Sequence, residues 1–200
     1  MKEIKICSLF SGIGGIEKGV KKALEEKKYS VKVIEAAEKD NLTNECYKII
    51  HNLKPKNDVK MIDEKEIEDF DLLLAGFPCQ PLSISGSRRG FEDERGQLFF
   101  EIIRILKNKK PETIILENVK GLMNHDKGRT INTIFEELSE QGYGLDFYVM
   151  DTSQYGIPQK RERIYIVGRY RKEEGEWKDI EGKNEYIKTK NKLNENKKMG

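Results

Sequence analysis

The segment IKICSLFSGIGGIEKGVKKALEE, residues 4–26, decides the fold class, because a strand, a glycine turn and a helix follow one another directly. The apolar run 4–10 is typical of a buried strand, and Ile16, Val20 and Leu24 recur after it at helical spacing. A strand that turns tightly into an amphipathic helix is the opening unit of a parallel βαβ sheet. The N-terminal part of the chain therefore predicts an α/β fold.

The same alternation continues along the chain to about residue 170. Apolar runs predict further strands at 31–37, 71–75, 113–116, 145–150 and 163–168. Amphipathic stretches between them predict helices at 41–53, 96–110 and 129–141. Strands that alternate with helices imply parallel βαβ units, so we predict a doubly wound sheet.

The helix predicted after the second strand begins at a cap formed by Asn41 or Thr43. Its apolar face is predicted to consist of Cys46, Ile49, Ile50 and Leu53. We expect this face to be buried and His51, on the same helix, to lie away from any ligand site.

Composition excludes several classes of protein. Charged residues make up 36% of the chain, yet the formal net charge is only +2, so nucleic-acid binding would require a local basic surface. No segment approaches the roughly 18 apolar residues of a membrane span, and no signal peptide is recognisable. The wide spacing of Cys7, Cys46 and Cys79 gives neither a disulfide framework nor a zinc pattern. We expect a reduced cytoplasmic protein without a membrane anchor or a metal.

Four unusual sites follow the first four predicted strands. In chain order they are FSGIGG at 10–15, Glu38, GFPCQ at 76–80 and Glu117. Ligands of doubly wound sheets bind beyond the carboxyl ends of the strands. We therefore expect these four sites to converge at one edge of the sheet.

The glycine turn has two readings. Gly12, Gly14 and Gly15 either form a plain tight turn or let a ligand approach the backbone beside a helix N-terminus. Glu38 lies where a carboxylate accepts hydrogen bonds from ribose hydroxyls, although a lone Glu also serves as a solvated helix cap. Asp58 either accepts a hydrogen bond from an adenine amino group or occupies an ordinary surface position.

Cys79 is the candidate nucleophile. It lies at the expected ligand edge, and Pro78 stiffens its turn, whereas most cysteines are small buried hydrophobes. Cys7, inside a strand, is expected to be such a residue. A Cys–His hydrolase is the competing interpretation, and its histidine would have to be His51 or His125, of which the latter is expected to be solvated.

Polar residues near the last strands extend this picture. Glu117 either reaches water or shares a proton with a heterocyclic base. Lys160, Arg161 and Arg163 form either a solvated basic rim or a clamp for a phosphate or carbonyl oxygen. The loop 85–96 has the glycine content expected of a lid.

Taken together, these motifs resemble the DNA cytosine-5 methyltransferases. The resemblance covers about residues 4–170 and is carried by LFSGIGG, by GFPCQPLSISG followed by RGFEDERGQLFFEIIRIL, by ENVKGL and by QYGIPQKRERIYIVG. It implies a Rossmann-like methyltransferase fold with a mostly parallel sheet and an antiparallel closing strand. It also implies S-adenosylmethionine as cofactor, a flipped cytosine in double-stranded DNA as target, and a restriction-modification enzyme.

The resemblance assigns roles to individual residues. Cys79 would attack carbon 6 of cytosine, Glu117 would hold N3, and Arg163 would orient the base. The catalytic set is Cys79, Glu117, Arg161 and Arg163. The cofactor set is Phe10, Gly12, Gly14, Glu38, Asp58 and Pro78. The DNA-binding set is Ser83, Ser85, Arg88 and Arg89.

The chain departs from the family pattern at several points. Ser8, Lys39 and Asn57 replace a common Asp, an aromatic residue and a Gly, respectively. The target-recognition domain is expected to be absent, with 1–170 forming the catalytic and cofactor-binding domain and 171–200 a polar linker or tail. We expect a second polypeptide to carry the missing domain and motifs. The alternatives are a truncated, inactive cofactor-binding or scaffold module, and methylation of RNA cytosine.

Overall fold

Apolar residues dominate β1 (Glu3–Leu9) and β3 (Leu72–Ala75), and the last four residues of β1 and all of β3 are buried, as central strands of a parallel sheet require. The structure is a computed structural model that describes residues 2–78 and 97–171. In chain order, with 3₁₀ helices written η, the elements are β1, α1 (Gly15–Glu26), β2 (Ser30–Ala37), α2 (Asn41–His51), η1 (Val59–Met61), β3, α3 (Gln97–Lys109), β4 (Thr113–Val119), η2 (Lys120–Met123), η3 (His125–Gly128), α4 (Arg129–Glu140), β5 (Tyr143–Asp151), η4 (Thr152–Tyr155) and β6 (Glu162–Tyr170).

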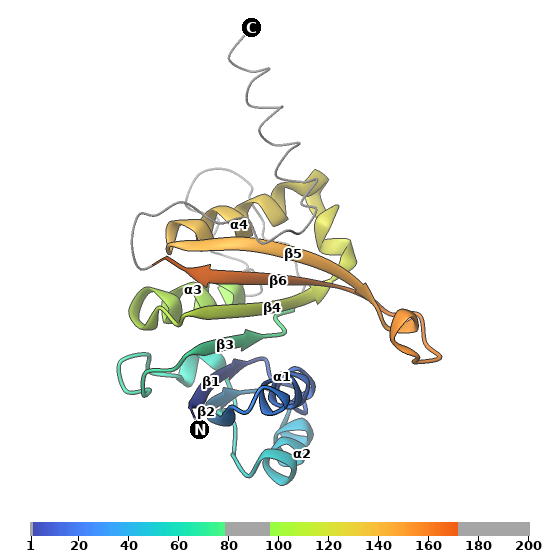
Figure 1. The fold of residues 1–200 in the computed structure, drawn as a ribbon. Helices are drawn as coiled ribbons and strands as arrows, with labels where there is room; N and C mark the ends of the chain where they lie inside the picture. The colour runs from blue at the N-terminus through green and yellow to red at the C-terminus, as the bar shows by residue number, and fades with distance from the viewer. Residues whose placement is uncertain (1, 79–96, 172–200) are drawn as a thin grey trace, which may run out of the picture. The chain divides into compact units, whose positions relative to one another are not determined.

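The sheet has six strands in the order β2-β1-β3-β4-β6-β5 (Figure 1). The first four strands of this order pair in parallel, with Ile6 opposite Leu72 and Ala75 opposite Leu116. Among the described residues, β6 is the strand that runs antiparallel to both of its neighbours. The predicted doubly wound, mostly parallel sheet with an antiparallel closing strand is confirmed.

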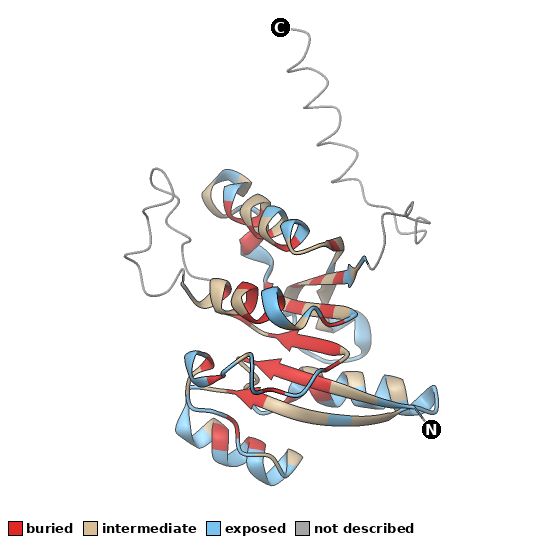
Figure 2. Ribbon diagram, turned by 90° about the vertical axis from the view of Figure 1, so that its left-hand side faces the viewer, coloured by how far each residue is buried: buried red, intermediate tan, exposed pale blue. Residues whose placement is uncertain are grey.

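Helices cover both faces of the sheet. On one face α3 and α4 bury side chains such as Ile102, Leu106 and Ile134 against the strands. On the other face α1 packs Ile16 and Val20 against a smaller apolar cluster. Figure 2 shows the buried residues concentrated in the central strands and on the inner sides of the helices. This layering leaves the carboxyl ends of the parallel strands free for a ligand.

The strand β4 is longer than predicted. It continues through the ENV motif to Val119, so Glu117 lies within the strand and not after its end. The pairing with β3 stops at Leu116, but the pairing with the longer β6 continues to the Val119–Arg163 pair. Hydrogen bonds to β6 therefore keep the backbone extended after the apolar run has ended.

The prediction for α2 was wrong in two respects. Its cap is Asp40, whose carboxylate accepts a hydrogen bond from the Thr43 N–H at 2.7 Å. The predicted apolar face points to solvent: Ile49 is 82% exposed, Ile50 is 54% exposed, and Cys46 is exposed. The buried side chains of the helix are instead Asn44 and Tyr47.

The reason is that Tyr47 and Asn44 have buried polar partners. The Tyr47 hydroxyl donates to the carboxylate of Glu17 at 3.1 Å, and the Asn44 amide donates to the Glu38 carbonyl at 2.8 Å. Buried polar groups must be hydrogen-bonded, so these contacts fix which side of α2 faces the protein.

In the two described ranges, no helix has the length and apolar character that crossing a membrane would require. The predicted limits of the catalytic domain and the tail stay predictions, because residues 172–200 lie outside the described part of the chain.

Candidate active site

The glycine turn joins β1 to α1 in an unusual backbone conformation. Phe10, Gly12 and Gly14 have φ angles of 54°, 55° and 86°, in the left-handed region that glycine tolerates best. At Gly14 an added Cβ would lie 1.8 Å from Nε2 of His51, so a side chain there would displace the imidazole and would also be strained at this φ. The turn therefore combines backbone strain at Phe10 with a close approach of His51 to Gly14.

Glu38, at the end of β2, holds this turn from one side. One carboxylate oxygen accepts from the Gly12 N–H and the other from the Asp40 N–H, each at 2.9 Å. A carboxylate oxygen has more than one acceptor site, so both oxygens keep the capacity to accept from a ligand. The structure thus brings the predicted residues Gly12 and Glu38 together.

Asn44 links Glu38 to the segment that carries Asp58. Its amide donates to the Glu38 carbonyl and, at 3.0 Å, to the Asn57 side-chain oxygen. Asn57, which departs from the family pattern, therefore has a structural partner. Asn44 was not predicted, because a lone Asn on a helix gives no signal in the sequence.

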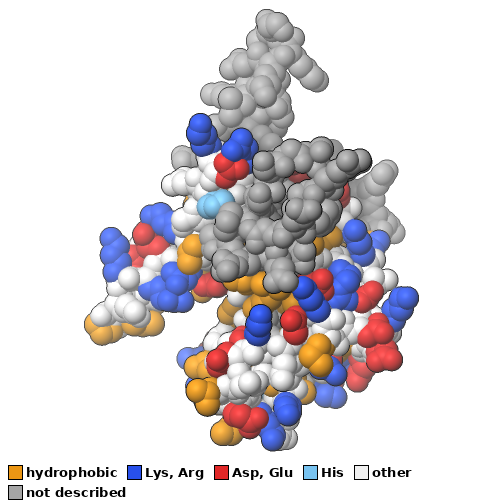
Figure 3. All heavy atoms as spheres, turned by 180° about the vertical axis from the view of Figure 1, so that it is seen from behind, with side chains coloured by type: hydrophobic (Ala, Val, Ile, Leu, Met, Phe, Trp, Pro, Cys, Tyr) orange, Lys and Arg blue, Asp and Glu red, His pale blue; other side chains and the backbone are white. Residues whose placement is uncertain are grey.

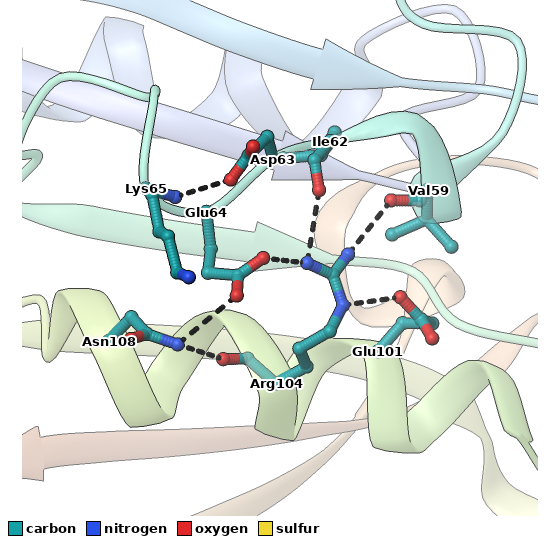
Figure 4. A network of polar contacts seen from close by, with 8 residues as sticks. All are labelled: Val59, Ile62, Asp63, Glu64, Lys65, Glu101, Arg104 and Asn108. Atoms are coloured by element: carbon teal, nitrogen blue, oxygen red, sulfur yellow. Dashed lines mark hydrogen bonds and ion pairs between the residues drawn. The ribbon is translucent and has the colours of Figure 1, made fainter.

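Arg104 of α3 holds the turn that follows Asp58 (Figure 4). Its guanidinium donates to the carbonyl of Ile62 at 3.0 Å and to that of Val59 at 3.3 Å, and it pairs with Glu64 and Glu101. Asp58 itself caps η1, since its carboxylate accepts from the Lys60 N–H at 2.9 Å. Arg104 thereby fixes the turn that follows Asp58 to α3.

A cavity of about 440 Å³ opens at the carboxyl ends of the parallel strands. Its lining includes five residues predicted from the sequence: Phe10, Gly12, Glu117, Arg161 and Arg163. Glu38 and Asp58 are not among its lining residues in the described part of the chain; Glu38 supports the cavity through Gly12.

Gly76 brings three strand ends into contact. A Cβ on this residue would lie 3.6 Å from Oε2 of Glu117 and 3.6 Å from the Phe10 carbonyl oxygen. The first, third and fourth of the unusual sites therefore meet at one edge of the sheet, and Glu38 joins them through the glycine turn. The predicted convergence is confirmed for the residues that the structure describes.

Glu117 and Arg163 form an ion pair inside the cavity. The distance from Arg163 Nε to Glu117 Oε1 is 3.0 Å, and the side chains are 21% and 19% exposed. Glu117 is paired with Tyr165 across the strands, which places Arg163 diagonally opposite it on the same face. Burial, and then the charge of Glu117, raises the pKa of Tyr165 above its ordinary value, so this phenol stays neutral. Glu117 therefore meets a guanidinium and does not simply reach water, and its contact with a heterocyclic base stays a prediction.

Asn118 positions the segment that leads to the candidate nucleophile. It is 2% exposed, and its amide donates to the Phe77 carbonyl at 2.9 Å, one residue before Pro78. The sequence reasoning missed this residue, although the ENV motif contains it. Pro78 is exposed at the end of this segment.

Several predicted residues lie outside the described residues. They are Cys79, Ser83, Ser85, Arg88 and Arg89, together with the proposed lid at 85–96. Their roles stay predictions.

The structure shows the surroundings of both histidines and of Cys7. His51 was expected to lie away from the ligand edge, which is wrong, since its Nε2 is 3.3 Å from the Ile13 carbonyl of the glycine turn. His125 is not simply solvated, because its Nδ1 is 2.7 Å from the Thr130 hydroxyl. Cys7 is fully buried as expected, and burial raises the pKa of its thiol.

The β5–β6 hairpin extends beyond the end of β4 and carries the basic rim. Pairing of the two strands continues to Asp151 and Glu162, and Tyr155 and Ile157 in the connection are 60% and 48% exposed. Figure 3 shows hydrophobic side chains at the end of this projection, with Lys and Arg side chains near them. Arg161, at its base, is exposed and lines the cavity.

The architecture is that of S-adenosylmethionine-dependent methyltransferases. The Dnmt2 methyltransferase of S. pombe superposes with a TM-score of 0.69 at 28% identity, over 87% of this chain and 53% of that chain. The DNMT2 mutant E260A/E261A/K263A of Spodoptera frugiperda gives a TM-score of 0.68 at 26% identity, over 90% of this chain and 54% of that chain.

The chain belongs to the C-5 cytosine-specific DNA methylase family, whose family model matches residues 4–200. The type II methyltransferase M.NgoBI of Neisseria gonorrhoeae is 49% identical over 164 residues, which are 82% of this chain and 50% of that protein. The type II methyltransferase M.HaeII of Haemophilus aegyptius is 46% identical over 168 residues, 84% of this chain and 51% of that protein.

These findings confirm the predicted family and its cofactor, S-adenosylmethionine. The match runs past residue 170, where the quoted motifs end, so the similarity is longer than predicted. The chain spans about half the length of the two curated relatives.

Proposed function

We propose that this chain is the catalytic half of a DNA cytosine-5 methyltransferase of the restriction-modification type. It transfers a methyl group to carbon 5 of cytosine through a covalent adduct with Cys79. The observation that carries this proposal is the cavity that joins the glycine turn, through Phe10 and Gly12, to the Glu117–Arg163 pair. A nucleotide-like cofactor and a heterocyclic base would meet there.

The described residues fit the cofactor. Gly12 lines the cavity with a left-handed backbone and presents no side chain to a ligand, and Glu38 keeps acceptor capacity for ribose hydroxyls. Phe10 would lie against the adenine, and Asp58 would accept from its amino group. When bound, S-adenosylmethionine supplies an electrophilic methyl group.

The described residues also fit a cytosine. The Glu117 carboxyl holds N3 and the exocyclic amine, and Arg163 both fixes Glu117 and directs a donor to the base carbonyl oxygen. Arg161 lies on the cavity wall beside them. The base must leave the duplex to reach this position, at a cost of a few kcal/mol.

The nucleophilic step follows from the chemistry of the ring. The Cys79 thiolate adds to carbon 6, which breaks the aromatic conjugation and makes carbon 5 nucleophilic. After carbon 5 has been methylated, loss of its proton re-forms the double bond and expels the thiolate. Asn118, which binds the Phe77 carbonyl, anchors the chain two residues before Cys79.

Recognition of the DNA sequence is proposed to require the part of the relatives that this chain does not span. Ser83, Ser85, Arg88 and Arg89 would contact the DNA near the flipped base. A second polypeptide or a further segment would read base edges in the major groove. The support is the length of the two curated relatives, of which the matched region is 50% and 51%.

Covalent trapping tests the proposal. An oligonucleotide that contains 5-fluorocytosine has no proton to lose at carbon 5, so the adduct with the protein persists. We expect an adduct when the chain is mixed with the cofactor and a polypeptide that covers the remaining half. C79S should abolish the adduct and leave cofactor binding unchanged.

The matched control is C46S, which changes an exposed cysteine outside the cavity lining and should trap normally. Adduct formation by C79S, or cofactor binding without any adduct for the wild type, would contradict the proposal. The second result would favour an inactive cofactor-binding module.

A further inference from the structure

A buried carboxylate under the glycine turn has no role in the proposed chemistry. Glu17 of α1 is 2% exposed, and its Oε1 accepts from the Ser8 hydroxyl at 2.5 Å and from the Tyr47 hydroxyl at 3.1 Å. Burial, and then the charge of Glu17, raises the pKa of Tyr47, which keeps the phenol a neutral donor. One carboxylate thus joins β1, α1 and α2 at the base of the turn.

From Tyr47 the contacts continue to the turn itself. The Tyr47 and His51 rings lie 4.3 Å apart between centroids, tilted by 31°. Nε2 of His51 is 3.3 Å from the Ile13 carbonyl oxygen. A carbonyl can only accept, so this nitrogen carries the proton and donates. The ring also occupies the place that a side chain at Gly14 would need.

The turn needs such support on the side of α2, because the Ser11 hydroxyl, which donates to the Ala37 carbonyl at 3.4 Å, ties the turn to β2 only. The Ile13 side chain is 56% exposed, and Phe10 holds a left-handed conformation that costs free energy for a residue with a Cβ. Glu38 fixes the turn at the Gly12 N–H, from the side of β2. His51 fixes the Ile13 carbonyl from the side of α2.

We propose that Glu17, Tyr47 and His51 form one positioning unit, and that His51 is a positioning residue for cofactor binding through its contact with the glycine turn. The inference rests on the proposed cofactor site. Its consequence is that loss of the His51 donor weakens cofactor binding, whereas turnover with saturating cofactor is retained.

Variants of His51 in the full chain test this proposal by equilibrium binding of labelled S-adenosylmethionine. H51F keeps a ring against Tyr47 but removes the donor to Ile13, so the Kd should rise by about tenfold, the loss of one hydrogen bond. H51Q retains a side-chain donor and should recover most of the affinity. The control is K48Q, an exposed position on the same helix, which should bind as the wild type does.

Melting temperatures without cofactor separate positioning from stability. A positioning role predicts that H51F loses affinity while it melts within a few degrees of the wild type. If H51F does not fold, Y47F decides, since it keeps the ring stack and loses only the hydroxyl bond to Glu17.

Two results have distinct meanings. Failure of the wild type to bind S-adenosylmethionine would contradict the proposed function. Normal wild-type binding with an unchanged Kd for both H51F and Y47F would contradict only the positioning role, as would the absence of recovery in H51Q.

Discussion

The two sides of the cavity are built in different ways. On the glycine side, the lining is the glycine turn itself, from Phe10 to Ile13 together with Gly15, and the side chains of Glu38 and His51 hold the backbone of this turn from outside the lining. On the strand side, the lining includes three charged side chains, Arg161, Arg163 and Glu117, of which the last two pair across β4 and β6. A backbone surface suits a cofactor held in one orientation, whereas paired charges suit a reacting ring. Binding of the cofactor and chemistry on the base should therefore be separable by mutation.

The largest separation is expected at Glu117. E117Q removes the charge that pairs with Arg163 and the group proposed to hold N3, so kcat should fall by about 100- to 10,000-fold. Cofactor affinity should stay within about twofold, because Glu117 acts on the strand side. Steady-state methylation of DNA and equilibrium cofactor binding measure the two quantities. The control is E112Q, at an exposed position just before β4. A loss of cofactor affinity in E117Q as large as its loss of kcat would contradict the separation of the two sides of the cavity.

A smaller effect is expected at Arg104, which supports the Asp58 turn without lining the cavity. R104M leaves the carbonyls of Val59 and Ile62 and the carboxylates of Glu64 and Glu101 without this donor (Figure 4). The free energy of unfolding should fall by about 2 kcal/mol. Urea denaturation measures this loss.

The control on the same helix is K109M, because the partner of Lys109, Asp69, is 93% exposed. Because Asp69 lies in water, this pair contributes about 0–1 kcal/mol, and Met keeps the packing of the Lys109 stem, whose side chain is 12% exposed. Equal losses for R104M and K109M would show that the Arg104 contacts have no special role.

The smallest effect is expected at Glu38. In E38Q one carboxylate oxygen becomes an NH₂ group, which cannot accept from the Gly12 or Asp40 N–H. The KM for cofactor should rise by about tenfold, the equivalent of one hydrogen bond, with kcat unchanged at saturation. E45Q, an exposed position on α2, serves as the control. A loss confined to kcat would place Glu38 on the chemical side of the cavity.

The two helices α3 and α2 show what the sequence can predict. In α3 the apolar stripe that includes Phe99, Ile102 and Leu106 is buried in the sheet core, as its periodicity indicates. In α2 the periodicity again identifies residues of one face, but that face is exposed. Periodicity shows which side chains lie together, whereas partners such as Glu17 for Tyr47 decide which face turns inward.

The site shows the same division. Phe10, Gly12, Glu117 and Arg163 lie in local motifs, and they line one cavity as expected. Asn44, Asn118 and His51 have roles that depend on partners at least six residues away in the sequence, so their own neighbours in the sequence give little signal. The end of β4 was misplaced for a similar reason, because its pairing with β6 is a long-range contact.

The outward stripe of α2 also bears on how this chain behaves in a test tube. Leu42, Ile49 and Ile50 are 80%, 82% and 54% exposed and follow one another along a single helix. Water-exposed stripes of this kind make molecules adhere to one another, because contact removes apolar surface from water. That attraction weakens on cooling. Low temperature and low protein concentration are therefore the conditions expected to keep this chain in solution.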